Sequence, residues 1–139
     1  MTQIEQRQDR LHKAFANKGM RYTKQREHIY NILLDKRDHP TAEEIFLRAR
    51  EKLGSISFAT VYNCLDTLVE CDLVRQVHID RESTRYCPNL TEHAHYHCPE
   101  TGEIHDIQIP DNLFDTIRDQ LPQDFSIDSV EILIRGKTN

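Results

Sequence analysis

The spacing of apolar residues predicts four helices in the first 72 residues of the chain. The first is expected over about residues 5–17, with Gly19 as its C-terminal cap. The second begins at Thr23, an N-cap residue, and stops before Pro40. Its apolar residues follow the i, i+3, i+4 spacing that lines one face of a helix. This stretch is therefore expected to be helical, with one buried face on each helix.

Two more helices are predicted, and each has a capping residue at its start. Thr41 and Glu44 have the spacing of a capping box, in which Thr41 accepts from the backbone of Glu44 and Glu44 reaches back. Gly54 is expected to end this helix. Ser57 caps the fourth, which is expected over about residues 57–71 with an apolar stripe along it.

The apolar pattern then changes from a helical to an alternating period. Residues 73–79 and 84–87 are predicted to form two short strands around a turn at residues 80–83. Three helices followed by such a hairpin, or wing, are typical of a winged helix-turn-helix. The first of the four helices is then an addition at the N-terminus.

The remaining residues follow the order strand, strand, helix, strand. Histidines alternate over residues 93–97, residues 99–102 form a turn, and apolar residues mark the later elements. We therefore predict an α+β protein, with a winged-helix DNA-binding domain over residues 1–86 and a β-β-α-β metal-binding and dimerisation domain over residues 87–139. About fifty residues of this kind seldom fold alone, so a homodimer is expected.

Composition places the chain among ordinary globular proteins. Of its 139 residues 37% are hydrophobic and 29% charged. No apolar run approaches the roughly 18 residues needed to span a bilayer, and the polar N-terminus resembles no secretory signal. We expect a cytoplasmic protein with no membrane partner. The four cysteines, at positions 64, 71, 87 and 98, are expected as core thiols or metal or redox groups rather than disulfides.

The net charge of −5 is distributed unevenly. Residues 1–85 contain 15 Lys and Arg against 13 Asp and Glu, whereas residues 86–139 contain 3 against 10. The first part tolerates a polyanion and the second repels one, which is consistent with two modules that have different partners.

The histidine-rich strand carries the clearest chemical signal. Alternate side chains of a strand share a face, so His93, His95 and His97 are expected about 6.6 Å apart on one side. Neutral imidazoles held side by side lose solvation unless they share a ligand, which favours a metal site. Other candidates from the same reasoning are His39, Cys87, His105 and Asp106, and also His78 beside the wing turn.

The predicted DNA-reading helix contains no Lys or Arg. Its exposed polar residues near the start are Ser57, Thr60, Tyr62 and Asn63. Tyr62 can contact a thymine methyl group and Asn63 can pair with adenine, which suits A/T-rich operators. Phosphate contacts are expected from other basic residues, namely Lys18, Arg21, Lys24, Arg26 and Arg81.

Several linked motifs resemble the ferric uptake regulator (Fur) superfamily over about residues 11–135. They are Gly19-x-Arg21-x-Thr23-x-Gln25-Arg26, His39-Pro40-Thr41-Ala42-Glu43-Glu44-Ile45, Ala59-Thr60-Val61-Tyr62-Asn63, Arg85-Tyr86 and His93-x-His95. The resemblance implies a cytoplasmic homodimeric repressor that binds palindromic operators in double-stranded DNA when loaded with iron, manganese, zinc or nickel. It also implies a metal site at His39, Cys87, His93, His95 and Asp106.

Two departures from the family pattern bear on the metal. Many members hold a structural zinc ion with two Cys-x-x-Cys pairs, but Thr101 stands at the second position here and no cysteine follows Cys98. We therefore expect that site to be absent. The hinge ligand is usually Asp or Glu in iron and peroxide sensors, whereas Cys87 is a softer ligand that favours Zn²⁺ over Fe²⁺ or Mn²⁺.

These observations predict a metal-responsive repressor of metal homeostasis that senses zinc. The alternative is an iron- or manganese-loaded repressor on the same fold that responds to peroxide or redox state. The sequence Thr60-Val61-Tyr62-Asn63 looks more like the peroxide- and haem-linked iron branches. A zinc hydrolase is disfavoured because the candidate ligands fill the shell and no His-Glu-x-x-His motif is present. No enzymatic activity is expected.

Overall fold

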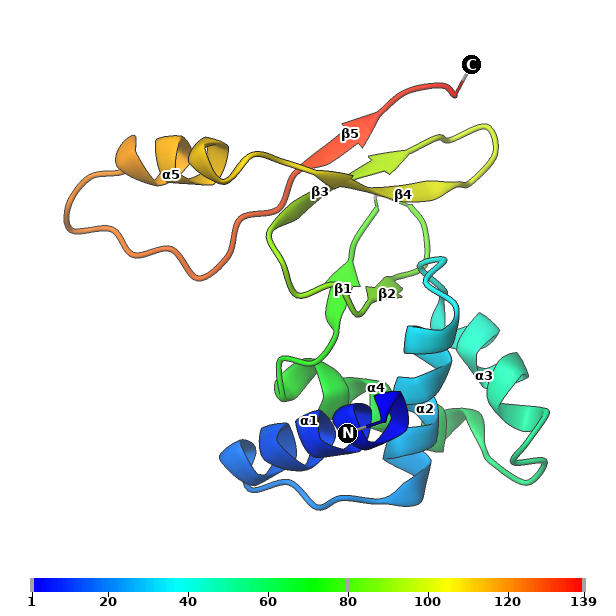
Figure 1. The fold of residues 1–139 in the computed structure, drawn as a ribbon. Helices are drawn as coiled ribbons and strands as arrows, with labels where there is room; N and C mark the ends of the chain where they lie inside the picture. Colours follow the sequence, from blue (N-terminus) through cyan, green and yellow to red (C-terminus); the bar gives the residue numbers. More distant parts are fainter. Residues whose placement is uncertain (1, 80, 139) are drawn as a thin grey trace. The chain divides into compact units, whose positions relative to one another are not determined.

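The computed structural model describes residues 2–79 and 81–138, which fold into two compact units on either side of the Leu90–Thr91 bond (Figure 1). Asp80, the first residue of the predicted wing turn, lies outside the described residues. The predicted boundary after residue 86 falls inside a strand of the first unit, and that strand ends at Cys87. No helix in the described part of the chain is long and apolar enough to cross a membrane.

The first unit contains the four predicted helices. They are α1 (Gln3–Lys18), α2 (Lys24–Asp35), α3 (Ala42–Arg50) and α4 (Phe58–Glu70). Thr23 and Ser57 cap α2 and α4 as expected, each accepting a hydrogen bond from the backbone three residues on. Gly19 ends α1 with a φ of 67°, a left-handed conformation that glycine adopts without a steric penalty.

The ends of two helices differ from the predictions for local reasons. Helix α1 starts two residues early because Thr2 and Glu5 form a capping box. Helix α3 ends at Arg50 instead of reaching Gly54, since the amides of Glu51 and Lys52 bond to carbonyls only three residues back and tighten the last turn.

The side chain of Glu44 also differs from the predicted capping box. Thr41 Oγ1 accepts from the amide of Glu44 at 3.3 Å, as predicted. Glu44 Oε1, however, accepts from the Thr41 hydroxyl at 3.2 Å rather than from the Thr41 backbone. Oε1 also lies 3.8 Å from Arg85 and Oε2 lies 3.7 Å from Arg48, so these cations compete for the carboxylate.

One continuous hydrophobic core holds the helices and the wing together. It includes Leu11 and Phe15 of α1, Leu33 of α2, Ile45 of α3 and Leu65 of α4, all fully or almost fully buried. The wing consists of β1 (Arg75–Val77) and β2 (Arg85–Cys87), paired antiparallel. Strand β1 is shorter than predicted because Leu73 and Val74 pack into the helical core.

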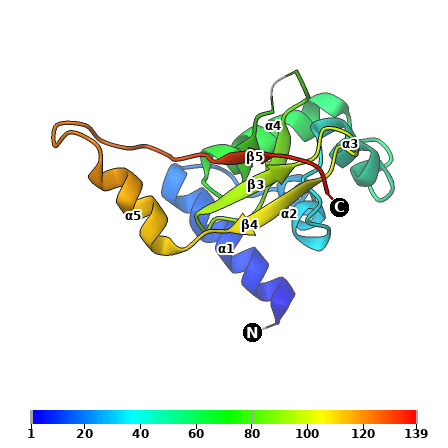
Figure 2. The ribbon, with the colours of Figure 1, turned by 90° about the horizontal axis from the view of Figure 1, so that it is seen from above.

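The second unit is a three-stranded sheet with one helix. Strands β3 (His93–His97) and β4 (Ile104–Gln108) form a hairpin, α5 covers Asp111–Asp119, and β5 (Leu133–Arg135) returns parallel to β3. Strand β3 therefore lies between β4 and β5 (Figure 2). The predicted α+β class and the β-β-α-β order are confirmed.

The predicted stripe on α5 is only partly correct. Leu121 lies beyond the end of the helix, because the proline at position 122 disfavours a helical backbone at the residue before it. Phe114 is the one buried residue of α5. The last strand is also shorter than the alternation from Val130 predicted, although the carbonyl of Ile132 accepts from the amide of His95 at 3.0 Å.

Candidate metal and DNA-binding sites

Three candidate metal ligands converge on the sheet of the second unit. His93 and His95 are two residues apart on β3, and their Nε2 atoms are 3.0 Å from each other. Asp106 lies opposite His95 in the β3–β4 register. Its Oδ1 atom is 3.3 Å from Nε2 of His93 and 3.2 Å from Nε2 of His95. The alternation of the strand and the pairing with β4 thus place two imidazoles and one carboxylate around a common point.

The tautomer of His93 suits a metal ligand. Its Nδ1 atom lies 2.6 Å from the carbonyl oxygen of Thr91, which has no hydrogen to donate, so Nδ1 carries the proton. The lone pair is then on Nε2, the atom that faces His95 and Asp106. A carbonyl that fixes the ring in this way is a common support of metal-binding histidines.

The distances between these donors fit the edges of a coordination shell. Ligands about 2.0–2.1 Å from a tetrahedral Zn²⁺ are about 3.3 Å apart. Adjacent ligands about 2.1 Å from an octahedral ion are about 3.0 Å apart. The observed range of 3.0 to 3.3 Å matches both geometries. The donor set therefore fits a divalent transition metal without selecting one.

His39 and Cys87 form a second pair of candidate ligands, within the first unit. Both are buried, with 5% and 1% of their surfaces exposed. A ring nitrogen of His39 lies within 4.8 Å of the Cys87 sulfur. His39 stands in the loop between α2 and α3, and this loop is attached to β2 because the amide of Tyr86 donates to the carbonyl of Pro40 at 3.0 Å. Residues 48 positions apart in sequence are thereby brought together.

The remaining candidate histidines lie elsewhere. His97 is buried at the other end of β3, opposite Ile104. His105 is exposed on β4 and its Nε2 is 3.2 Å from Glu103 Oε2. His78 is exposed beside the wing turn, with Nδ1 3.3 Å from the Thr84 hydroxyl.

Cys98, at the end of β3, has an environment that the sequence did not reveal. A hydrogen bond from the Thr101 side chain and others from the backbone of Thr101 and Thr138 lower the pKa of its thiol to about 7. Burial instead raises the pKa of Cys64 in α4. Cys98 is therefore the thiol with the stronger thiolate character, although its surface is only 1% exposed.

The predicted DNA contacts gather on one face of the first unit. A shallow cavity of about 270 Å³ is lined by Arg21 and Arg26 near the start of α2 and by Thr60 and Asn63 of α4. Tyr62, on the same helix, is 45% exposed. Candidate phosphate contacts and candidate base contacts are thus neighbours, as a helix-turn-helix requires.

The other predicted DNA contacts differ in whether their side chains are held by neighbouring residues. Lys24 is exposed at the start of α2, and Arg81 is exposed in the wing with a φ of 66°. Lys18 lies 3.9 Å from Asp72 in a weak surface pair. Arg26 is more constrained, because its guanidinium donates to the carbonyl of Arg21 and lies over the ring of Phe15.

Comparisons with known proteins identify relatives of this chain. The peroxide-responsive repressor PerR of Staphylococcus epidermidis is 35% identical over 92 residues, which cover 66% of this chain and 61% of the relative. The matched segment therefore spans less than two thirds of that protein. The structure of the Helicobacter pylori ferric uptake regulator Fur superposes with a TM-score of 0.75 at 23% identity, covering 98% of this chain and 93% of that one.

A second solved structure, the Campylobacter jejuni peroxide stress regulator, gives a TM-score of 0.71 at 24% identity and covers 100% of this chain and 98% of that one. At these identities the two structures establish the fold. The model of the ferric uptake regulator family matches residues 17–134. The predicted resemblance to this family is confirmed. The chain belongs to the ferric uptake regulator family.

Proposed function

We propose that this chain is a metal-dependent transcriptional repressor that binds double-stranded DNA as a homodimer in the cytoplasm. The observation that carries the proposal is the convergence of His93, His95 and Asp106, in a chain whose other unit has a helix-turn-helix surface. Three donors within 3.0–3.3 Å of one another fit a bound cation better than an unoccupied polar surface.

We propose that His39 and Cys87 complete the ligand set begun by His95, Asp106 and His93. A bound divalent ion would supply bonds to donors from both units. His39 belongs to the loop before α3, and Cys87 to the wing, so capture of these two side chains would restrict the first unit. That restriction would favour the arrangement of a dimer that fits two half-sites, which is a shift of population towards the DNA-binding state.

The relatives favour a response to peroxide, and the ligand set is compatible with iron or manganese. A relative at 35% identity is named a peroxide-responsive repressor. The Asp106 carboxylate and the two imidazoles are ligands that Fe²⁺ and Mn²⁺ accept. The motif Thr60-Val61-Tyr62-Asn63 points to the same branch. This alternative of our sequence analysis is therefore the better supported response.

Zinc sensing remains a second candidate because of one residue. Cys87 is 1% exposed and within 4.8 Å of a ring nitrogen of His39, so it is available as a thiolate ligand beside an imidazole. Thiolate and imidazole together favour tetrahedral Zn²⁺, which is inert to redox chemistry. The two responses therefore differ in whether peroxide changes the loaded protein.

The dimer is supported by the surface of the second unit. Leu113, Phe125 and Ile134 are 40%, 62% and 40% exposed, which is a large apolar area for 49 residues. A second copy covering these side chains would supply the missing core.

Metal analysis of the purified protein, followed by peroxide treatment, tests the response. The chain is loaded with Fe²⁺ or Mn²⁺ without oxygen, or with Zn²⁺, and then exposed to hydrogen peroxide. We expect the iron-loaded form to lose DNA binding and to gain oxygen on a histidine or on Cys87 by mass spectrometry, while the zinc-loaded form keeps DNA binding. Equal loss of DNA binding by the zinc-loaded form, or no loss by the iron-loaded form, contradicts the peroxide response.

A further inference from the structure

The backbone of His39 is held in an unusual conformation. Its φ of 54° lies in the left-handed region, which is disfavoured for a residue with a side chain. The residue is also buried, with 5% of its surface exposed. Such a conformation persists only where neighbouring groups hold it, and it is often found at functional sites.

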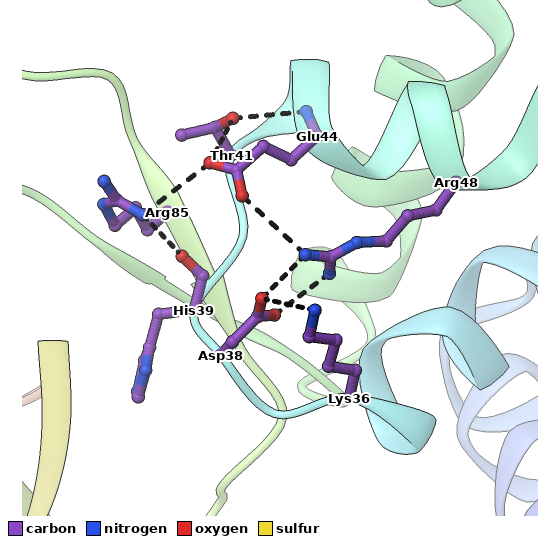
Figure 3. A network of polar contacts seen from close by, with 7 residues as sticks. All are labelled: Lys36, Asp38, His39, Thr41, Glu44, Arg48 and Arg85. Carbon is purple, nitrogen blue, oxygen red and sulfur yellow. Dashed lines mark hydrogen bonds and ion pairs between the residues drawn. The ribbon is translucent and has the colours of Figure 1, made fainter. Parts of the chain in front are cut away.

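Arg85 of β2 is the neighbour that holds the His39 backbone. Its Nη1 atom donates to the carbonyl oxygen of His39 at 3.0 Å. A bridge between Thr41 and Arg85 attaches the same segment to β2. Figure 3 shows the consequence, because the carbonyl of His39 points to Arg85 while its imidazole points away from the network.

The same guanidinium also reaches the start of α3. Nη1 of Arg85 lies 3.8 Å from Oε1 of Glu44, and this oxygen accepts from the hydroxyl of Thr41, the N-cap residue. Glu44 is in the first turn of α3 (Figure 3). The same carboxylate oxygen thus pairs with Arg85 and supports the helix cap. One cation contacts both the His39 carbonyl and the carboxylate that orders the helix start.

The other flank of His39 is attached to α3 as well. Asp38 accepts two hydrogen bonds from Arg48, at 3.0 and 2.7 Å. Arg48 also lies 3.7 Å from Glu44. Helix α3 packs against α4, the helix with Tyr62 and Asn63. A movement of the His39 loop would therefore displace the start of α3, the helix that packs against the DNA-reading helix α4.

We propose that Arg85 is a positioning residue that fixes the left-handed backbone of His39, presents its imidazole beside Cys87, and couples the His39 loop to the start of α3. The coupling to metal rests on the proposed function, whereas the positioning of the loop does not. Loss of this guanidinium leaves the His39 carbonyl and Glu44 without the bond that joins them. The loop and the first turn of α3 then become more mobile together.

Variants of the full chain test this role. Arg85→Gln removes the ion pair and shortens the donor, and Arg85→Lys keeps the charge but replaces the planar guanidinium by a single ammonium group. The matched control is Arg75→Gln on the neighbouring strand. Arg75 also donates to a backbone carbonyl, but to that of Leu90, at 2.9 Å, rather than to that of His39.

The first measurement uses the metal-free protein. We expect amide hydrogen exchange at Glu44 and Ile45 to be about tenfold faster in Arg85→Gln than in the parent and in Arg75→Gln, because the cap has lost its support. The exchange rate of Arg85→Lys should lie between those of Arg85→Gln and the parent. If Arg85→Gln does not unfold cooperatively, Arg85→Lys takes its place in the comparison. Exchange equal to that of the parent in both Arg85 variants overturns the positioning role.

The second measurement titrates each variant with Co²⁺, whose visible absorption reports imidazole and thiolate ligands. Loss of a group that orients a ligand weakens metal binding by about 10- to 100-fold, so we expect that loss for Arg85→Gln and no change for Arg75→Gln. Parent-like Co²⁺ affinity together with faster exchange overturns the coupling to the metal. If the parent itself binds no Co²⁺, the proposed function fails, and the exchange measurement still decides the positioning role.

Discussion

The two units of the molecule differ sharply in how completely they bury their apolar residues. In the first unit, residues from all four helices and from the wing form one continuous buried core. In the described part of the second unit, four apolar side chains are buried, namely Ala94, Cys98, Ile104 and Phe114. The first unit has a core adequate for independent folding, whereas the second has too little for a unit of its size. From this contrast we expect the first unit to fold without the second, and the second to need a partner.

Separating the units is expected to have the largest effect. A fragment of residues 1–90 should unfold cooperatively and at a temperature that does not depend on protein concentration. A fragment of residues 91–139 should be unfolded at low micromolar concentration and gain structure as the concentration rises, because association supplies its core. Circular dichroism over a hundredfold range of concentration measures both. A 91–139 monomer that unfolds cooperatively at about 1 µM contradicts the contrast.

A smaller effect is expected to separate two classes of residue on the proposed DNA-reading face of the first unit. Tyr62→Ala and Asn63→Ala should change the preferred operator, with each lost base contact costing about 1–3 kcal/mol of discrimination. Arg21→Ala and Lys24→Ala should weaken binding to all sequences alike and reduce the salt dependence, because their expected contacts are phosphates. Binding to a set of operators that differ by one base pair measures both. Uniform weakening by Asn63→Ala across that set would remove its recognition role.

The smallest expected effect concerns Cys98 in the second unit. Because hydrogen bonds from Thr101 lower the pKa of this thiol to about 7, the folded state favours the thiolate. A lowered pKa stabilises the fold fully above the pKa of the unfolded thiol, about 8.5, and the contribution is lost as the pH falls through about 7. The difference in melting temperature between the parent and Thr101→Val should therefore increase as the pH rises from about 7 to about 8.5.

The matched control for this effect is Thr116→Val on α5, where the hydroxyl donates to the carbonyl of Asn112 at 2.6 Å and contacts no thiol. Its melting temperature should follow the parent across the same pH range. A pH dependence of Thr101→Val identical to that of the parent would exclude a thiolate at Cys98.

Local signals in the sequence were sufficient to predict most of the fold. Gly19, Thr23 and Ser57 end or begin helices as expected, since each acts through backbone atoms within a few residues. Leu121 was assigned to a helix that ends before it, although the proline at position 122 was a visible signal. The errors are thus at element ends, where local signals such as this proline and the capping box of Thr2 and Glu5 were overlooked.

Long-range features of the site could not be predicted in the same way. The alternation of His93 and His95 was visible, because it depends on a two-residue period. The hydrogen bond from Arg85 to His39 joins residues 46 positions apart, and the φ of 54° at His39 has no glycine to mark it. The Arg85-Tyr86 motif was visible as part of the family resemblance, but the contacts of the guanidinium could be identified only in the structure.

The most direct test of the central claim is DNA binding of the full chain with and without metal. Sequences are selected from a random double-stranded library by the metal-loaded protein, and the affinity for the selected DNA is then measured after chelation and after reloading. We predict enrichment of palindromic A/T-rich sites, and binding that falls at least tenfold on chelation, equal to about 1.4 kcal/mol, and returns with metal. A metal-dependent repressor would be contradicted if chelation left the affinity for a tightly bound selected site unchanged and His95→Ala kept the same affinity.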